Sequence, residues 1–551
     1  MKDNLFSYEI DEHYATLTAY FSMEFALDQA LKTYGGGLGF LAGSHLRSAY
    51  DKRQRLLGVG ILWSYGYYDQ SRHEDSTLKV EFRRKFYYFL QETGVVVEVR
   101  INDQPVKVKA YIVPSETFGA APLILLTTDI FENDHLSRTI THRLYDPNEE
   151  TRIAQEIVLG IGGYKVLEAM GIEPDIFHLN EGHPLPLAFE LLRRKRSKEE
   201  VKKRLVFTTH TPEMAGNEEH DVDLLERMGF FAGLPKEEIQ RELNYYDQNF
   251  SLTVGALKLA KRANAVSKIH EKVSNKMWAH VKNRCEIISI TNAQNMNYWA
   301  DKQLLSWMQE HEDYQLVGRK KHLKRKLFEE VADQTGKLFD PDICTLVWAR
   351  RFAEYKRPKL LVRNMERFRA LVTNEEYPIQ IVWAGKPYPF DSNAIETFNE
   401  LVHMSREFKN VAVLIGYELR LSKLLKQGSD LWLNTPRWGR EASGTSGMSA
   451  GVNASINFSV DDGWVAEFGK DGINSFIIPH ADPSLKKEEI DAKDHETMME
   501  KLQDTILPLY YDHPQEWLRI AKEGMNDILH YFDSGRMVKE YYEKLYDWRE
   551  R

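Results

Sequence analysis

The sequence is poor in cysteine and has no long apolar run. Its two cysteines, Cys285 and Cys344, are too few for a disulfide framework, and no Cys-x-x-Cys pair or Cys/His cluster suggests zinc. No run of about 18 apolar residues occurs, and the first residues lack the apolar segment of a signal peptide. We therefore expect a cytoplasmic protein that has no membrane partner and binds no metal.

The excess of acidic over basic residues is also small in this chain. It has 73 basic and 82 acidic residues, for a net charge of −9, which argues against a nucleic-acid partner. The basic runs 193–196 and 319–321 are typical of solvated helix faces. With 551 residues, 42% of them hydrophobic, the chain can form more than one large core.

What the sequence does contain is a regular alternation of β-rich and helical segments. The segments 356–372 and 391–408 have helical length and spacing, and between such segments lie short β-rich runs at 174–179, 204–209, 343–349, 378–384 and 411–415. This alternation predicts an α/β protein with mostly parallel sheets and helices on both faces.

A charged stretch near 297–313 separates two such series. We therefore expect two Rossmann-like domains, residues 1–300 and 301–513, followed by a helical segment, 514–551, that packs back on the first domain. Sheets of this kind bind ligands at the carboxyl ends of their strands, so the expected active site is a cleft between the domains.

Tyr34-Gly35-Gly36-Gly37-Leu38-Gly39 has the composition of a glycine-rich turn that opens a helix. Glycines let a backbone approach a phosphate closely, and free amides at a helix start favour anions. Gly36 and Gly37 are therefore candidate phosphate-binding residues, although the same residues suit a tight structural turn.

Two histidine-containing loops follow apolar strands. His178-Leu179-Asn180-Glu181-Gly182-His183 ends the run at 174–179, and Thr208-Thr209-His210-Thr211-Pro212 ends the run at 204–209. A histidine in such a loop either stabilises the loop or contacts a ligand. Asn180, His183 and His210 are the candidates for ligand contact.

The segment Arg351-Phe352-Ala353-Glu354-Tyr355-Lys356-Arg357 also follows a strand. Arginine presents a planar fork of donors and lysine a compact charge, so Arg351 and Lys356 can neutralise phosphate oxygens and stabilise a departing phosphate. Without further context, the segment also fits a surface ion-pair cluster around Glu354.

The run 441–449, Glu-Ala-Ser-Gly-Thr-Ser-Gly-Met-Ser, is the most specific motif of the chain. Its glycines and hydroxyl residues could present backbone amides to a phosphate at a helix start. The candidate phosphate-binding residues are Gly444, Thr445, Ser446 and Gly447.

Taken together and in this order, from about Tyr20 to Glu467, these segments resemble the α-glucan (glycogen, maltodextrin) phosphorylases of the short bacterial and archaeal type. The matching family patterns are Y-x-G-G-L-G, H-L-N-E-G-H, T-T-H-T-P, R-R-F-x-x-Y-K-R and E-A-S-G-T-(G/S)-(N/G)-M-K. The resemblance implies the two-domain GT-B glycosyltransferase fold.

The resemblance also implies roles for individual residues. His183 would hydrogen-bond the donor sugar, with Asn180 and His210 in the same cleft. Arg351 and Lys356 would hold the transferred phosphate, and Glu441 would accept hydrogen bonds from sugar hydroxyls.

The chain departs from the family pattern where the cofactor is attached. The family's final lysine forms a Schiff base with pyridoxal phosphate (PLP), and here that position is Ser449, whose hydroxyl cannot form an imine. Thr291-Asn292-Ala293-Gln294-Asn295 stands where short phosphorylases have T-N-G-V-H, and Trp438-Gly439 interrupts the usual R-P.

These departures suggest that the site keeps its sugar–phosphate chemistry without PLP. In a phosphorylase the PLP phosphate and the inorganic phosphate together mimic the diphosphate of a nucleotide sugar. We therefore predict a retaining transferase that needs no cofactor and moves a hexose, with glucose favoured, from a nucleotide sugar to a sugar or small-molecule acceptor.

In that hypothesis Arg351, Lys356, Glu441 and His183 carry the reaction. Two alternatives stay open: a phosphorylase that holds PLP or another phosphate noncovalently, and a noncatalytic glucan-binding or regulatory protein. The sequence leaves open the donor nucleotide, the acceptor, the direction of the reaction and whether the chain forms a homodimer.

Overall fold

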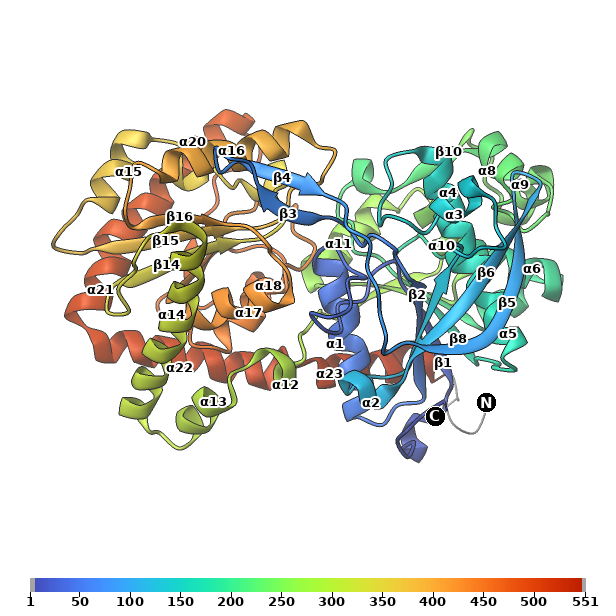
Figure 1. Cartoon of the computed structure of the whole chain (residues 1–551), viewed down its shortest axis with the longest axis horizontal. Coiled ribbons are helices and arrows are strands. Elements are labelled where there is room, and N and C mark those ends of the chain that lie inside the picture. Colours follow the sequence, from blue (N-terminus) through green and yellow to red (C-terminus); the bar gives the residue numbers. More distant parts are fainter. Residues whose placement is uncertain (1–4, 548–551) are drawn as a thin grey trace. The chain divides into compact units, whose positions relative to one another are not determined.

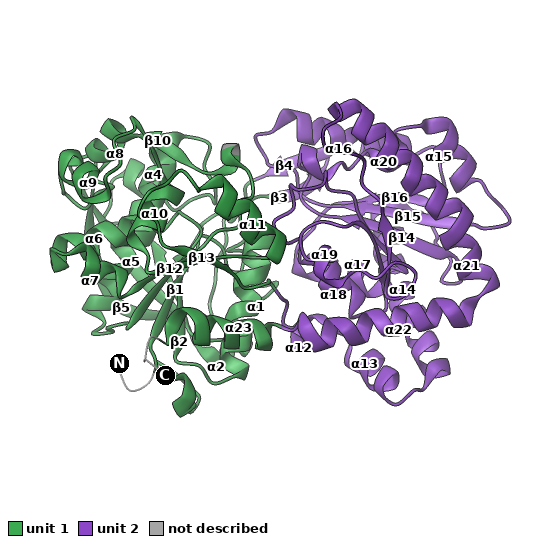
Figure 2. Cartoon of the chain, turned by 180° about the vertical axis from the view of Figure 1, so that it is seen from behind, with its two compact units in different colours: residues 1–68, 82–292, 534–551 green, residues 69–81, 293–533 purple. Residues whose placement is uncertain are grey.

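The computed structural model describes residues 5–547, which divide into two compact units (Figures 1 and 2). Unit 1 comprises residues up to 68, residues 82–292 and residues from 534 onward, and unit 2 comprises residues 69–81 and 293–533. Both units are α/β, as the sequence predicted. Among the described residues, no helix is both long and apolar enough to cross a membrane.

Unit 1 is built on a nine-stranded sheet. In spatial order its strands are β13 (Glu286–Ser289), β12 (Arg262–Ala265), β9 (Leu205–Thr208), β8 (Ile176–Asn180), β1 (Thr18–Phe21), β2 (Leu56–Ile61), β7 (Leu123–Thr127), β6 (Gln104–Val113) and β5 (Gln91–Ile101). The strands from β13 to β7 are parallel, whereas β6 and β5 form an antiparallel edge. Asn102 and Asp103 have φ of 50° and 60°, the left-handed conformation that a tight hairpin turn requires, and they join β5 to β6.

Helices and a short strand pair complete unit 1 in the described part of the chain. The helices are α1 (Gly37–Asp51), α2 (Ser115–Phe118), α3 (His135–Thr139), α4 (Glu149–Ile157), α5 (Gly163–Ala169), α6 (Pro186–Lys195), α7 (Lys198–Lys202), α8 (Val222–Met228), α9 (Lys236–Leu243), α10 (Leu252–Leu259), α11 (Lys268–Met277) and α23 (Ser534–Tyr541). The pair consists of β10 (Glu219–Asp221) and β11 (Asn249–Ser251), which are antiparallel.

Unit 2 contains a fully parallel six-stranded sheet. In spatial order its strands are β16 (Val411–Leu414), β15 (Ile379–Ala384), β14 (Cys344–Ala349), β17 (Leu431–Asn434), β18 (Ile456–Val460) and β19 (Ser475–Ile478). Numbered along the chain, this order is 3-2-1-4-5-6, that of a dinucleotide-binding Rossmann sheet. Every residue of β14, β15 and β17 is buried, because helices cover both faces and so select continuous apolar runs.

Helices connect the strands of unit 2 and extend beyond its sheet. They are α12 (Met296–Trp299), α13 (Lys302–Gln309), α14 (Asp313–Thr335), α15 (Met365–Val372), α16 (Ser392–Ser405), α17 (Leu419–Gly428), α18 (Ser446–Gly451), α19 (Val465–Phe468), α20 (Lys487–Lys501), α21 (Leu507–Asp512) and α22 (Pro514–Tyr531). The expected helix over 356–372 is shorter, because only α15 and two 3₁₀ turns form there.

The division of the chain differs from the expected domains in three places. Residues 293–300 lie in unit 2, and so do residues 514–533, which the sequence analysis placed in the terminal segment. The reason is that α22 buries Trp517, Ile520 and Met525 in the core of unit 2. Only the part from residue 534 onward belongs to unit 1, where Ser534 contacts Ser48 through their hydroxyls (2.5 Å).

The third difference is a hairpin, β3 (Asp69–Arg72) and β4 (Leu78–Glu81), that leaves unit 1 and joins unit 2. Gln70 donates to the Gly385 carbonyl (3.0 Å), Arg72 donates to the Val413 carbonyl (2.7 Å), and Leu78 enters the core. The amino-acid composition does not change at this hairpin, so nothing in the sequence indicated that it belongs to unit 2.

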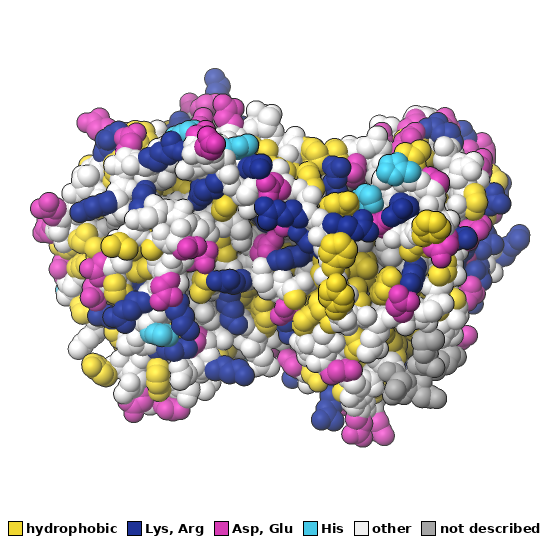
Figure 3. Space-filling model, in the orientation of Figure 1, with side chains coloured by type: hydrophobic (Ala, Val, Ile, Leu, Met, Phe, Trp, Pro, Cys, Tyr) yellow, Lys and Arg dark blue, Asp and Glu magenta, His cyan; other side chains and the backbone are white. Residues whose placement is uncertain are grey.

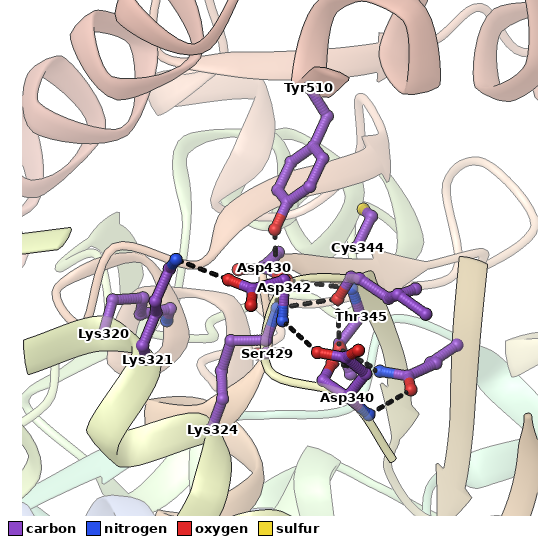
Figure 4. Close-up of polar contacts among 12 residues, drawn as sticks. Lys320, Lys321, Lys324, Asp340, Asp342, Cys344, Thr345, Ser429, Asp430 and Tyr510 are labelled. Atoms are coloured by element: carbon purple, nitrogen blue, oxygen red, sulfur yellow. Dashed lines mark hydrogen bonds and ion pairs between the residues drawn. The ribbon is translucent and has the colours of Figure 1, made fainter. Parts of the chain in front are cut away.

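A buried polar network lies at the amino-terminal edge of the unit 2 sheet (Figure 4). Lys324 of α14 pairs with Asp430, which precedes β17, at 2.5 Å, and Asp430 also accepts from the Thr345 amide at 2.9 Å. Lys320 donates to two backbone carbonyls at 3.0 and 2.7 Å. These residues lie at the edge opposite to the carboxyl ends of the strands.

Candidate functional site

The candidate site of unit 2 lies where the strand order reverses, between β14 and β17. The chain continues from β14 into Arg350 and from β17 into the loop that leads to Glu441. At such a reversal the two loops turn away to opposite sides of the sheet, which leaves a crevice that ligands use. The motif residues of unit 2 are therefore gathered by topology and not by closeness in sequence.

Glu441 is held between two cations at this position. Its Oε2 accepts from Lys356 Nζ at 2.6 Å and from Arg350 Nη2 at 3.0 Å, and all three side chains are largely buried. Burial alone would raise the pKa of Glu441, but the charges of Lys356 and Arg350 outweigh it and hold the pKa below its usual range. Glu441 is therefore an ionised carboxylate within a net cationic group.

Several polar atoms beside this group are buried without a protein partner. They are Nε and Nη1 of Arg350, both amide atoms of Asn434 and the hydroxyl of Ser443. A buried polar group of this kind costs about 1–3 kcal/mol unless a water or a ligand satisfies it. An anion that accepts from Arg350 would remove part of that cost.

The arginine that contacts Glu441 is Arg350, whereas Arg351 was the one predicted from the sequence to hold the phosphate. The Arg351 side chain is exposed, although its charge also contributes to the lowered pKa of Glu441. Two arginines follow β14 directly, and consecutive side chains of an extended segment point to opposite sides. The pair could thus have been recognised as two candidates, but their order could not.

Ser449 lies within α18 and is completely buried. Its hydroxyl donates to the Ser446 carbonyl at 3.2 Å, and its carbonyl accepts from Asn453 at 2.8 Å. A serine hydroxyl offers no amine, so covalent attachment of PLP does not fit this position.

Two positions of the same segment, 444 and 447, require glycine for different structural reasons. Gly444 has φ of 81°, which favours glycine. A Cβ on Gly447 would lie 2.3 Å from Asn457 Oδ1, so no larger residue fits there. Thr445 and Ser446 form the start of α18, and the Ser446 hydroxyl accepts from Trp432 Nε1 at 3.3 Å.

In unit 1 the glycine loop is bound by a carboxylate of the protein itself. Glu24, which follows β1, accepts from the amides of Gly35 (2.7 Å) and Gly36 (2.9 Å), and also from the Tyr145 hydroxyl. From the sequence this loop was a candidate for phosphate binding or for a tight structural turn, and within unit 1 Glu24 accepts from two of its amides. A Cβ on Gly36 or Gly37 would meet nothing within 4 Å, so packing inside the unit does not explain these two glycines.

Asn180 and His210 form one hydrogen-bonded pair at the carboxyl edge of the unit 1 sheet. His210 Nε2 lies 2.7 Å from Asn180 Oδ1, and Asn180 Nδ2 donates to the Ser22 hydroxyl at 3.0 Å. Burial lowers the pKa of His210 to about 3, so its ring is neutral.

His183 belongs to a second group that contains Arg152 and Glu218. Its Nε2 lies 3.2 Å from Arg152 Nη2 and 3.5 Å from Glu218 Oε2, and Arg152 donates to both oxygens of Glu218 at 2.9 and 3.2 Å. Burial, together with the Arg152 charge, lowers the pKa of His183 to about 4. His183 is therefore a neutral imidazole held by an ion pair.

Sequence reasoning missed the partners of the motif histidines and glycines. Glu24 lies just after β1 and Arg152 lies in α4, and the motifs gave neither residue a role. Nothing local to Glu218 marks it, since its contacts lie 66 residues away at Arg152.

A separate cavity of about 570 Å³ opens in unit 2 beside the loop 352–363. Its lining includes Arg357, Arg437 and Asp491, which already form ion pairs of 3.0 and 2.7 Å with one another. Arg351, Lys356 and Glu441 do not line it.

On the face shown in Figure 3, acidic and basic side chains are interspersed.

Two Rossmann-type units, the second with a buried cationic group at its switch point, have the architecture of the GT-B-like glycosyltransferase fold. A family model described as carbohydrate phosphorylase matches residues 263–548, and one described as the starch synthase catalytic domain matches residues 65–276. The chain belongs to the carbohydrate phosphorylase family.

Relatives agree with this assignment. The chain is 32% identical to the maltodextrin phosphorylase of Thermococcus litoralis, over 96% of this chain and 70% of that protein. It is 30% identical to the glycogen phosphorylase of Aquifex aeolicus, over 97% and 87% respectively. It is 50% identical to an uncharacterized protein of Methanocaldococcus jannaschii, over 96% of this chain and 99% of that protein.

Proposed function

We propose that this protein is a PLP-independent, retaining glycosyltransferase that moves a hexose, with glucose favoured, from a nucleotide sugar to an acceptor hydroxyl. The observation that carries the proposal is that Arg350 and Lys356 both lie at the switch point, where each pairs with Glu441. Two guanidinium nitrogens of Arg350 have no partner there, and the position of the PLP lysine is Ser449. A site that keeps its cations but cannot attach PLP suits a substrate that carries its own second phosphate.

The diphosphate of a nucleotide sugar meets these requirements. Its two phosphates would accept from Arg350 and Lys356, which supply a planar fork and a point charge respectively. Arg351 is exposed beside them and extends the positive field. The Rossmann order of unit 2 supports the same assignment, since such sheets bind nucleotides at this reversal.

In the proposed reaction the bond between the sugar C1 and the diphosphate oxygen breaks while the acceptor hydroxyl attacks C1 from the same face. The proton of that hydroxyl passes to the departing diphosphate, so neither a protein nucleophile nor an added reactant is needed. Lys356 and Arg350 stabilise the negative charge that develops on the leaving group. Glu441 accepts hydrogen bonds from sugar hydroxyls.

Calorimetry with glucose esters of uridine, adenosine, guanosine and thymidine diphosphate tests this proposal on the purified full chain. We expect one of the four donors to bind, and Arg350→Ala or Lys356→Ala to weaken it by about 10–100-fold, since a hydrogen bond to a charged group contributes about 1.5–3 kcal/mol. Arg369→Ala is the matched control, because Arg369 pairs with Glu407 at the surface.

Failure of all four donors to bind would contradict the proposal. Characteristic PLP absorbance in the purified protein, together with phosphate-dependent cleavage of an α-glucan, would instead show that the protein works as a phosphorylase with a noncovalent cofactor. Binding of a glucan, without any effect of the Arg350 or Lys356 variants, would show a noncatalytic protein.

A further inference from the structure

Three side chains of metal-ligating type converge in unit 1. Glu156 lies in α4, Glu218 directly precedes β10, and His220 lies on β10. One potential ligand atom from each residue lies within 4.8 Å of those of the other two. Pairing of His220 with Phe250 across β10 and β11 fixes the strand that carries this histidine.

Two of these side chains are buried and have polar atoms without a hydrogen-bond partner. Glu156 is 0% exposed and both of its carboxyl oxygens lack a partner, and His220 is 6% exposed with an unpartnered Nε2. The other ring nitrogen of His220, Nδ1, lies 2.9 Å from Glu149 Oε1. A carboxylate on one imidazole nitrogen is the arrangement that orients metal-binding histidines, because it fixes the tautomer and leaves Nε2 to the ion.

The charges of the cluster also call for a cation. Arg152 donates to both oxygens of Glu218, at 2.9 and 3.2 Å. Neither oxygen of Glu156 has a hydrogen-bond donor. Burial together with the charge of Glu218 raises the pKa of Glu156 well above its usual range, as expected where the charged form of a buried carboxyl group is uncompensated. A divalent ion bound by Glu156, Glu218 and His220 would compensate that charge.

We propose that Glu156, Glu218 and His220 bind a divalent transition-metal ion of the zinc class. An imidazole beside two carboxylates favours zinc, iron or nickel over magnesium and calcium, which prefer ligand sets made of oxygen alone. Water completes the coordination.

The ion links the segment before β10 to α4. Through Glu218 it also fixes Arg152, and with it His183, whose Nε2 lies 3.2 Å from Arg152 Nη2. Glu218 is therefore a positioning residue for His183. This role does not depend on the donor that the enzyme uses.

The test is metal analysis and calorimetry on the tag-free full chain. After chelation and dialysis, we expect Zn²⁺ to bind at one equivalent with micromolar or tighter affinity, and Mg²⁺ and Ca²⁺ to bind at least about 100-fold more weakly. Glu156→Gln and His220→Ala should each weaken Zn²⁺ by about 100-fold or more. Glu150→Gln is the matched control, since Glu150 is an exposed neighbour on α4 that pairs with Arg227.

Unfolding experiments separate loss of the site from loss of the fold. Zn²⁺ should raise the unfolding midpoint of the wild-type chain by about 3 °C or more and leave that of the folded Glu156→Gln chain unchanged. A wild-type chain that binds no Zn²⁺ would overturn the proposal, and a proton shared between Glu156 and Glu218 would then explain the cluster. Equal Zn²⁺ affinity in wild type, Glu156→Gln and His220→Ala would overturn it as well.

Discussion

Glu441→Gln separates the two roles that Glu441 has in this account. In the structure the carboxylate neutralises Lys356 and Arg350, while in the proposed reaction it also accepts hydrogen bonds from the sugar. Glutamine keeps the shape and one acceptor oxygen but removes the charge. The substitution therefore frees the two cations for an added anion and weakens the hold on the sugar.

The magnitude follows from the two contacts of 2.6 and 3.0 Å. At an effective dielectric constant of about 20, each contributes on the order of 6 kcal/mol of Coulomb energy before desolvation. Breaking a buried pair typically costs about 3–5 kcal/mol. We expect the free energy of unfolding to fall by about 3 kcal/mol. An added diphosphate should recover at least about 1.4 kcal/mol of this, which is a tenfold gain in affinity.

The assay compares inorganic diphosphate binding by calorimetry with turnover of the donor that the protein accepts. Glu441→Gln should bind diphosphate about tenfold more tightly, yet turn over donor about 10–100-fold more slowly, because the charged acceptor for sugar hydroxyls is lost. Glu407→Gln, which removes an exposed ion-pair partner of Arg369, should change neither quantity. Unchanged or weaker diphosphate binding by Glu441→Gln would refute the view that Arg350 and Lys356 form the anion site.

Three further predictions concern the structure that supports the sites. Gly43→Ala places a Cβ 2.1 Å from the Ala26 carbonyl oxygen, so it should destabilise unit 1 by about 3 kcal/mol or more in urea unfolding. Gly318→Ala in α14, with open space around it, should instead stabilise the protein by about 0.5–1 kcal/mol. Glu24→Ala leaves three donors of the glycine loop region without their carboxylate and should cost about 2–4 kcal/mol, and an effect below 0.5 kcal/mol would show that water replaces it. Burial lowers the pKa of Lys320 from 10.5 to about 7. Between these two pKa values the unfolded chain binds more protons than the folded chain, so the free energy of unfolding should rise with pH by up to about 1.4 kcal/mol per pH unit. Lys320→Met should flatten that rise between pH 7 and 10, and equal slopes in both proteins would contradict the assignment.

Much of the fold could be predicted because its strands are short apolar runs that end in polar loops. The runs at 343–349, 378–384 and 411–415 became β14, β15 and β16 within one or two residues at each end. Burial on both faces of a parallel sheet produces such runs, so this signal is local. The β3–β4 hairpin and the return of the chain at residue 534 depend on distant contacts, and no local pattern marked them.

The candidate sites show the same limit. Motif positions drew attention to Lys356 and Glu441, and the structure places Lys356 Nζ 2.6 Å from Glu441 Oε2. Which of two adjacent arginines turns inward depends on how the chain leaves β14, and the sequence does not encode this in any residue type. Glu24 and Glu218 were missed because their importance comes from the groups that they contact across the fold.

The central claim is that this member of the phosphorylase family works with a nucleotide sugar and without PLP. The most direct measurement is the release of nucleoside diphosphate from each of the four glucose donors by protein purified without added PLP, in parallel with Lys356→Ala. We predict release from at least one donor, reduced at least about tenfold in the variant, since Lys356 stabilises the leaving group. No release from any donor, together with PLP-dependent phosphorolysis of an α-glucan by the same preparation, would contradict the claim.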